Sequence, residues 1–199
     1  MSNETIQNNW SIRQSQPSPL LTPSDLYTHL RLFPQNGAHP DDAYITALIA
    51  AATQAAEDYT QRAFMPRTVM LSRSHWADRL FLPVNPVQSV DSITYLDKDG
   101  NEQTLTDFTF VGDTVPAYID IHKQPEVSDK GRPITITMAA GYAIHDSPPE
   151  PVPAVFEMAV KLMVGNLYEN RESVTTEREA YALPQSFEYL LHPHRVLGV

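Results

Sequence analysis

Two long segments of helical periodicity, separated by short strand-like runs, constrain this sequence more than any other feature. The first covers residues 41–62 and the second residues 153–171, and in both, apolar residues recur at three- and four-residue spacing. Between them, apolar and β-branched residues alternate in short runs bounded by turn residues. We therefore predict an α+β fold in which a helical core of about four helices is interrupted by an inserted small antiparallel β module.

The two predicted helices have clear starts. Asp41 and Asp42 open the first, where the positive end of the helix dipole favours acidic side chains. One side of this helix is an apolar stripe, and the opposite side is rich in alanine, which permits close approach of another helix. Pro153 suits the first turn of the second helix, in which Glu157 and Lys161 form an exposed pair one turn apart.

Both helices carry apolar surface that a small α+β domain would struggle to cover alone. We therefore predict that they contribute to an interface between subunits, because apolar surface of this extent is normally buried. The candidate interface residues are Ile45, Leu48, Ile49, Ala52, Tyr59, Phe156, Leu162, Met163 and Leu167.

Residues 66–140 predict the β module. About five to seven short strands are indicated by alternating or β-branched runs. The sequence Asp97-Lys98-Asp99-Gly100 predicts a hairpin turn. The predicted strands lie at 68–72, 79–83, 87–95, 103–105, 108–111, 118–121 and 134–138.

The remaining sequence predicts an arm and a helical body. Residues 1–19 are polar and predict a flexible N-terminal arm with no core of its own. Trp10 is the exception in this arm: it either packs on its own subunit or anchors on a neighbour, a role in which aromatic side chains are favoured. The helical body is predicted to comprise 20–65 and 141–199, with additional short helices at about 23–32 and 184–191.

Charge and composition exclude several classes of protein. The formal charge is -10, from 24 acidic and 14 basic residues, which is unfavourable for gripping phosphates but compatible with letting DNA pass. The absence of cysteine excludes disulfides, thiolate metal sites and a cysteine nucleophile. The start of the chain lacks the pattern of a signal peptide, and no apolar run approaches the roughly 18 residues of a membrane span.

Motifs that could carry chemistry are weak. His192 and His194 flank a proline and could bind a metal weakly, but no suitably spaced acid completes the set, and a solvated tail is the alternative. Asp97, Asp99 and Gly100 lack calcium-loop spacing. A Ser/His/Asp triad is possible by inventory, yet the sequence has no nucleophile elbow and no glycine-rich phosphate loop. We expect no catalysis, no cofactor and no metal site.

The order of several motifs resembles a known family. Leu21-Thr22 and Asp25 open a short helix, and the later motifs follow in the order of the tailed-phage head–tail connector (adaptor) proteins, the gp6-like and gp8-like proteins. The resemblance covers residues 20–196 and excludes the arm. These later motifs are Asp41-Asp42, the run 55–62, Leu82-Pro83, Pro86-Val87-Gln88-Ser89-Val90, Ile93-Thr94-Tyr95, Asp99-Gly100, Ala140-Gly141-Tyr142, Val152-Pro153, the run 167–172 and the run 190–195.

This resemblance implies a structural virion protein. It implies a homo-oligomeric ring, commonly of twelve subunits, at the neck of the virion beneath the portal protein, assembled in the host cytoplasm. The ring would extend the channel through which double-stranded DNA passes without sequence-specific binding, and would present a surface to a downstream neck or tail protein. A C-terminal segment often reaches the portal in this family. Here the candidate portal-contacting residues are Phe187, Tyr189, Leu190, Leu191 and Arg195.

Two other functions stay open at this point. One is a different phage neck or tail-completion protein with a similar helical body. The other is an unrelated enzyme or ligand-binding domain. Oligomeric state and binding to the portal distinguish these alternatives from a connector.

Overall fold

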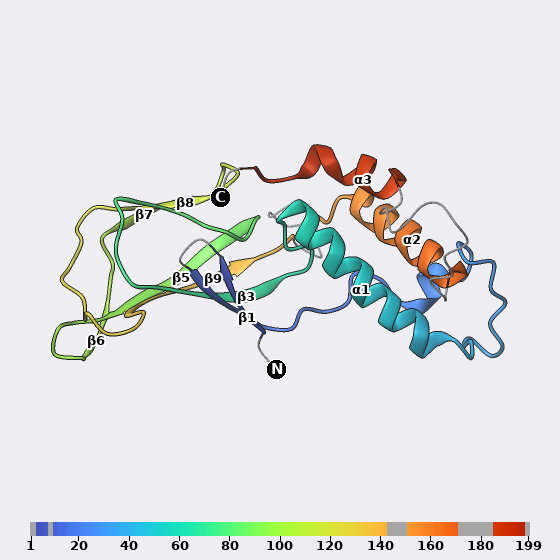
Figure 1. The fold of residues 1–199 in the computed structure, drawn as a ribbon, viewed down its shortest axis with the longest axis horizontal. Coiled ribbons are helices and arrows are strands. Elements are labelled where there is room, and N and C mark those ends of the chain that lie inside the picture. The colour runs from blue at the N-terminus through green and yellow to red at the C-terminus, as the bar shows by residue number, and fades with distance from the viewer. Residues whose placement is uncertain (1–2, 8–9, 143–150, 171–184, 198–199) are drawn as a thin grey trace, which may run out of the picture. The chain divides into compact units, whose positions relative to one another are not determined.

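The computed structural model describes residues 3–7, 10–142, 151–170 and 185–197, and these fall into two compact units. We call the first the sheet unit; it comprises residues 1–18, 61–151 and 196–199. The second, the helical unit, comprises residues 19–60 and 152–195. Both units are therefore built from discontinuous stretches of chain, as the colour gradient of Figure 1 shows.

The sheet unit contains a six-stranded antiparallel sheet (Figure 1). Strands far apart in the sequence are neighbours in it, since β3 pairs along its whole length with β9. The strand order is β1 (Asn3–Gln7), β2 (Trp10–Gln14), β3 (Arg67–Arg73), β9 (Ile134–Ala140), β5 (Val87–Leu96) and β6 (Glu102–Thr104).

A second, three-stranded antiparallel sheet completes this unit. Its central strand, β8, pairs on one side with β4 and on the other with β7. The strands are β4 (Arg79–Phe81), β8 (Tyr118–Ile121) and β7 (Phe108–Val111).

Alternation of side chains creates one apolar core from the two sheets. In β9 every second residue is buried, and the same period buries Ile119 and Ile121 in β8. Residues from both sheets belong to a single cluster of buried side chains, which includes Leu71 and Ile136 of the six-stranded sheet and Ile119 of the three-stranded sheet. The strands are therefore held together by shared burial as well as by their hydrogen bonds.

A buried asparagine joins three segments of the sheet unit. Asn85 is almost fully buried, and its side-chain oxygen accepts a hydrogen bond from the backbone N–H of Ala117 at 3.1 Å. Its backbone oxygen accepts another from the N–H of Ala63 at 2.7 Å. Because buried polar groups need hydrogen-bond partners, these bonds tie Asn85 to the segments that contain Ala63 and Ala117.

The helical unit is built on α1 (Asp42–Thr60) and α2 (Ala154–Glu169), which pack against each other. A shorter helix, α3 (Gln185–Leu191), packs on α2, and two 3-10 turns, η1 (Pro23–Leu26) and η2 (His192–His194), precede and follow these elements. The buried apolar residues of the unit are Leu21, Leu26, Ile45, Ile49, Ala52, Ala56, Phe156, Ala159, Val160, Val164, Phe187 and Leu191. No described helix is both long enough and apolar enough to cross a lipid bilayer.

Local sequence explains where the helices begin and end. Pro153, with φ −60°, precedes the first residue of α2, and the N–H of Asn170 donates to the oxygen of Asn166 at 3.0 Å where the helix ends. Gln61 follows the last residue of α1 with a φ of 56°, the left-handed conformation that commonly ends a helix.

The predicted helical core of about four helices with a small inserted β module is wrong. Across the described residues there are three α-helices, whereas nine strands form two sheets. The predicted helix at 23–32 is a four-residue 3-10 turn at Pro23–Leu26 followed by turns, and the φ of 55° at Arg31 is incompatible with a right-handed helix through that residue. Part of the predicted flexible arm instead forms β2, which pairs with β3 in the main sheet.

The positions of the individual helices and strands were easier to predict than the fold that they form together. The two long helices, the strands between them and the hairpin turn at 97–100 are confirmed within a few residues. The prediction was wrong about the proportion of helix to strand in the fold. The two long helices have a strong period in the sequence, whereas short strands gain most of their stability from pairing with strands that are remote in the sequence.

Candidate interaction surfaces

Two tyrosine–aspartate hydrogen bonds fix the start of α1. The phenol of Tyr27, just after η1, donates to the carboxylate of Asp42 at 2.8 Å. The phenol of Tyr168, near the end of α2, donates to Asp41 at 2.5 Å. Partial burial, followed by the hydrogen bond to Asp42, raises the pKa of Tyr27. The adjacent acids thus connect α1 to η1 and to α2.

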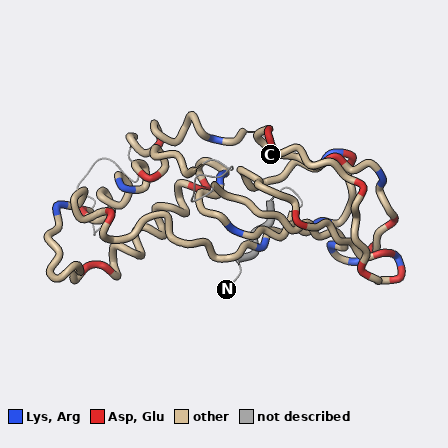
Figure 2. The backbone as a smooth tube through the Cα atoms, turned by 180° about the vertical axis from the view of Figure 1, so that it is seen from behind, with Lys and Arg blue, Asp and Glu red and all other residues tan. Residues whose placement is uncertain are grey.

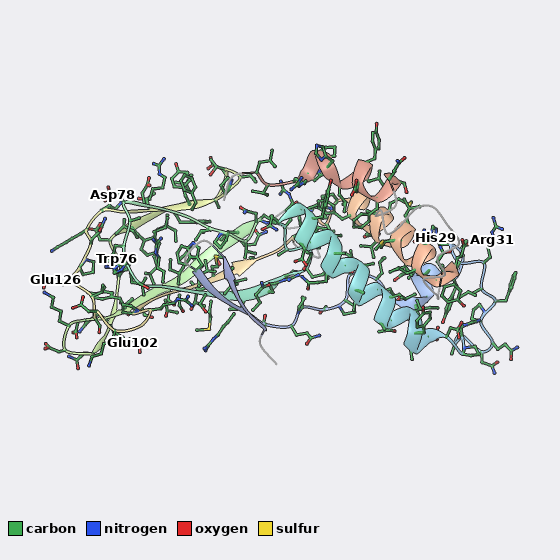
Figure 3. The ribbon with its side chains drawn as sticks, viewed as in Figure 1. His29, Arg31, Trp76, Asp78, Glu102 and Glu126 are labelled. Atoms are coloured by element: carbon green, nitrogen blue, oxygen red, sulfur yellow. The ribbon has the colours of Figure 1, made fainter. Side chains whose placement is uncertain are left out.

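The loop between η1 and α1 presents an exposed phenylalanine. The backbone groups of Gln35 and Ala38 exchange hydrogen bonds of 2.9 and 3.1 Å, closing a tight turn over Asn36 and Gly37, which both have positive φ. Phe33 lies just before this turn and is 88% exposed. Figure 3 labels His29 and Arg31, which precede Phe33 in the same loop.

The C-terminal segment is anchored to the helical unit by aromatic contacts. Phe187 and Leu191 are fully buried, and the ring of Phe187 lies 6.3 Å from that of Tyr59. The guanidinium of Arg195 lies 4.9 Å from the centroid of the Tyr59 ring and donates to the Tyr59 backbone oxygen at 3.2 Å. Tyr189, on the other side of α3, is 83% exposed.

Of the predicted portal-contacting residues, three therefore remain accessible. Phe187 and Leu191 fill the core of their own unit, while Leu190 is half-buried and Tyr189 and Arg195 are exposed. The buried pair secures α3, and the exposed pair is what a partner can reach.

The predicted interface residues of α1 and α2 also divide into buried and partly accessible side chains. Ile45, Ile49, Ala52 and Phe156 are buried within the helical unit itself, so the idea that a lone subunit cannot cover them is wrong. The half-buried residues are Leu48, Tyr59, Leu162, Met163 and Leu167.

Sequence reasoning also missed part of the inner side of α2. Val160 and Val164 are fully buried there, whereas Met158 is exposed. The α2 sequence is apolar almost all round, so periodicity alone does not fix which side faces inward.

Trp10 packs within its own subunit, one of the two alternatives that the sequence left open. It is 4% exposed and belongs to the core cluster of the sheet unit. The guanidinium of Arg73 lies 4.8 Å from its ring centroid, and burial lowers the pKa of Arg73. The indole of Trp10, a candidate anchor on a neighbouring subunit, is thus buried in the sheet unit of its own subunit.

The outer side of the three-stranded sheet carries a ladder of cross-strand pairs. Arg79 lies opposite Asp120, and Phe81 lies opposite Tyr118. Arg79 donates to the two carboxylate oxygens of Asp120 at 2.7 and 3.0 Å, and its guanidinium lies 4.2 Å from the Tyr118 ring centroid. The Tyr118 ring meets that of Phe81 edge-on at 5.8 Å. The Arg79 hydrogen bond, with its charge, lowers the pKa of Asp120.

One end of the sheet unit gathers polar loops around Trp76, as Figure 3 shows for Trp76, Asp78, Glu102 and Glu126. The indole N–H of Trp76 donates to the Pro125 oxygen at 2.9 Å, which fixes the loop before β9. Figure 2 shows the described Lys and Arg residues scattered over both units. Among the described residues, no group of three or more His, Asp or Glu is placed to hold a metal ion.

Comparison with solved structures identifies the fold. No family model matches the chain, and no curated protein does. A chain in the neck of an empty gene transfer agent (GTA) particle, solved with six-fold symmetry, matches with a TM-score of 0.71 and 23% identity. A chain in the virion of the native gene transfer agent particle gives 0.72 and 24%, and one in the native neck with twelve-fold symmetry gives 0.63 and 22%. Each match covers 100% of this chain and 97% of the other. The chain therefore has, over its whole length, the fold of chains found in these phage-like particles.

Proposed function

We propose that this chain is a structural subunit of the neck of a phage-like particle, acting as a head–tail connector beneath the portal. The observation that carries the proposal is fold agreement, over 100% of this chain and 97% of the other, with chains from particle necks. A shared fold alone is a weak guide to function. Here the motif order of the sequence independently resembles the connector family.

The ring form of the proposal rests on the symmetry of the similar assemblies. The similar neck structures have six-fold and twelve-fold symmetry, so each of their repeated chains meets neighbours around an axis. A subunit in such a ring needs surfaces for its neighbours and for the components above and below.

The charge of the chain fits a channel through which DNA passes. Because each copy has a net charge of -10, the ring would not grip phosphates, and in Figure 2 the described Lys and Arg residues are scattered along the backbone. Double-stranded DNA would slide past with little binding. The role is structural, and the proposal includes no reaction and no cofactor.

The portal-facing surface is proposed to include the exposed side of α3. Tyr189 is almost fully exposed on a helix that is itself anchored by two buried side chains. An exposed aromatic on a fixed support loses little freedom on binding, so it suits a contact residue. Arg195, held against Tyr59, lies in the same segment.

Binding to the portal tests the proposal. The purified chain would be mixed with the portal protein of the same particle, and the products would be examined by native mass spectrometry and electron microscopy. We expect a ring on the portal even if the chain alone is monomeric, because the portal can template assembly. A folded chain that never binds the portal contradicts the proposal, and binding to a tail protein instead would favour a tail-completion role.

A point variant tests the α3 surface without unfolding it. Deleting 185–197 would expose the core around Phe187, so Tyr189→Asp is the better change, with Glu188→Gln on the same helix as control. We expect about tenfold weaker portal binding for Tyr189→Asp and none of that loss for the control. Equal binding by both variants would place the portal contact elsewhere.

A further inference from the structure

The outer side of the three-stranded sheet has the character of a protein contact surface. We call it the β4–β8 face and define it by Arg79, Phe81, Val111, Tyr118 and Asp120, which the strand pairing places on one side. Phe81 is 47% exposed there, and Val115, in the loop between β7 and β8, is 53% exposed. Aromatic and arginine side chains are the residue types that most often dominate binding at interfaces.

The side chains of this face are already held in place before any partner arrives. Arg79 is fixed by its two-pronged bond to Asp120 and by its position over Tyr118. Tyr118 in turn supports Phe81 edge-on. Because ordering loose side chains opposes association, a face with fixed rotamers binds at a smaller loss of entropy.

The β4–β8 face has no net charge, whereas the whole chain has a net charge of -10. Arg79 and Asp120 compensate each other, and the remaining members carry no charge. Copies that each carry a net charge of -10 repel one another, so a contact between copies is most favourable where neither side adds negative charge. A nucleic acid would find no net positive charge here, which removes it as the occupant.

We propose that the β4–β8 face packs against a neighbouring copy of this chain in the assembled ring. This inference rests on the proposed function, from which the ring comes. Rotational symmetry above two-fold requires a head-to-tail contact, so the face meets a different surface of the next copy. Each copy then contributes its β4–β8 face once, and Phe81, an exposed aromatic ring of this face, is the main anchor.

The first test compares two exposed apolar residues on different sheets. Phe81→Ser removes the anchor, and Met70→Ser, at a residue of β3 that is 42% exposed, is the matched control. We expect Phe81→Ser to raise the concentration needed for ring assembly by about tenfold or more, and Met70→Ser to leave it unchanged. Circular dichroism and thermal melting of both monomers show that folding is intact. Ring assembly by Phe81→Ser at the wild-type concentration overturns the inference.

The second test uses the absence of cysteine from the chain, which allows one thiol to be introduced at a chosen place. Val115→Cys places it beside the β4–β8 face, and Asn101→Cys places it in the exposed turn between β5 and β6. We expect a water-soluble maleimide to label Val115→Cys at least about tenfold more slowly in the ring than in the monomer, with Asn101→Cys labelled equally in both. Equal labelling of Val115→Cys in both states overturns the inference.

Failure of this contact differs from failure of the proposed function. If the wild type binds the portal and Phe81→Ser assembles normally, the connector role stands and the β4–β8 contact is wrong. If the wild type self-associates through Phe81 without binding the portal, the contact stands and the connector role is wrong. If the wild type never self-associates, with or without portal, the contact is wrong.

Discussion

The two units of this chain are stabilised in different ways. In the sheet unit, strands from the beginning, middle and later parts of the chain share one apolar cluster. Among the described residues, the helical unit buries fewer apolar side chains, and it relies in addition on the hydrogen bonds of Tyr27 to Asp42, the first residue of α1, and of Tyr168 to the preceding Asp41. It also carries Phe33 and Tyr189, the two most exposed large apolar side chains among the described residues.

This difference suggests a division of roles. The sheet unit offers a rigid face whose side chains support one another, which suits a permanent contact between copies. The helical unit offers single aromatic residues on short, anchored segments, which suits contacts with a component of different shape. A change in the core of one unit should therefore leave the stability of the other unit unchanged.

The largest expected effect comes from the helical core. Phe156→Ala removes a fully buried ring from α2 and should destabilise the helical unit by about 3–5 kcal/mol. Both tryptophans, Trp10 and Trp76, belong to the sheet unit, so urea unfolding can be followed there by fluorescence and in the helices by circular dichroism at 222 nm. We expect only the helical signal to shift. A common shift of both signals would show that the two units unfold as one.

A smaller effect is expected from the buried asparagine of the sheet unit. Asn85→Ala leaves the N–H of Ala117 without its acceptor, which should cost about 1–3 kcal/mol. We expect the urea midpoint measured by tryptophan fluorescence to fall, and the midpoint measured by circular dichroism at 222 nm to stay unchanged. Asn101→Ala, in an exposed turn, is the control. An unchanged fluorescence midpoint would mean that another acceptor replaces the Asn85 side chain.

A single hydroxyl group tests the polar link between α1 and α2. Tyr168→Phe removes the hydrogen bond to Asp41 and should destabilise the helical unit by about 1 kcal/mol. Tyr189→Phe, which also loses one hydroxyl group but from an exposed ring, should change nothing measurable. Equal unfolding midpoints for the two variants would show that the Asp41 bond contributes no stability.

Acid should weaken both units modestly. The pKa values of Asp97 and Asp120 in the sheet unit, and of Asp25 in the helical unit, are lowered, chiefly by hydrogen bonds from Asn101, Arg79 and Thr22 respectively. A lowered pKa in the folded state means that the contribution is present above the unfolded value of 3.8 and is lost as pH falls through the folded value. We expect stability to decline below about pH 4, and Asp120→Asn to reduce the decline in the tryptophan signal.

The smallest effect on stability is expected at the most exposed apolar residue. Phe33→Ser should change the stability of either unit by no more than about 0.5 kcal/mol, because the ring is 88% exposed. Urea unfolding followed by both probes measures this. A clear loss of stability would mean that Phe33 packs against its own chain in solution.

Sequence patterns predicted the elements far better than their assembly. The strand at 134–140 and the helix at 42–60 could be located because each carries a regular period of its own. The pairing of β2 with β3 could not, because it joins segments more than fifty residues apart through backbone groups that every residue carries. The apolar residues Trp10 and Ile12, two positions apart, were a sequence signal for β2, but a strand of five residues is too short to stand out from a polar segment.

Surface residues were harder to predict than elements. A stripe of apolar residues such as Ile45 and Ile49 looks the same in the sequence whether it faces its own core or a neighbour. The β4–β8 face depends on which residues lie opposite each other on β4 and β8, and this register is set by the fold, not by local sequence.

The interleaved course of the chain has a consequence for its biosynthesis. Strand β3 can find β9 only after residue 140 has left the ribosome, and α1 must wait for α2 and then α3, which ends at Leu191. Pairings between such remote segments form slowly, because a long loop must be closed before any contact rewards it. Nascent chains will therefore spend most of translation with unpaired strand edges, and production in cells should improve when synthesis is slowed by cooling or when chaperones are abundant.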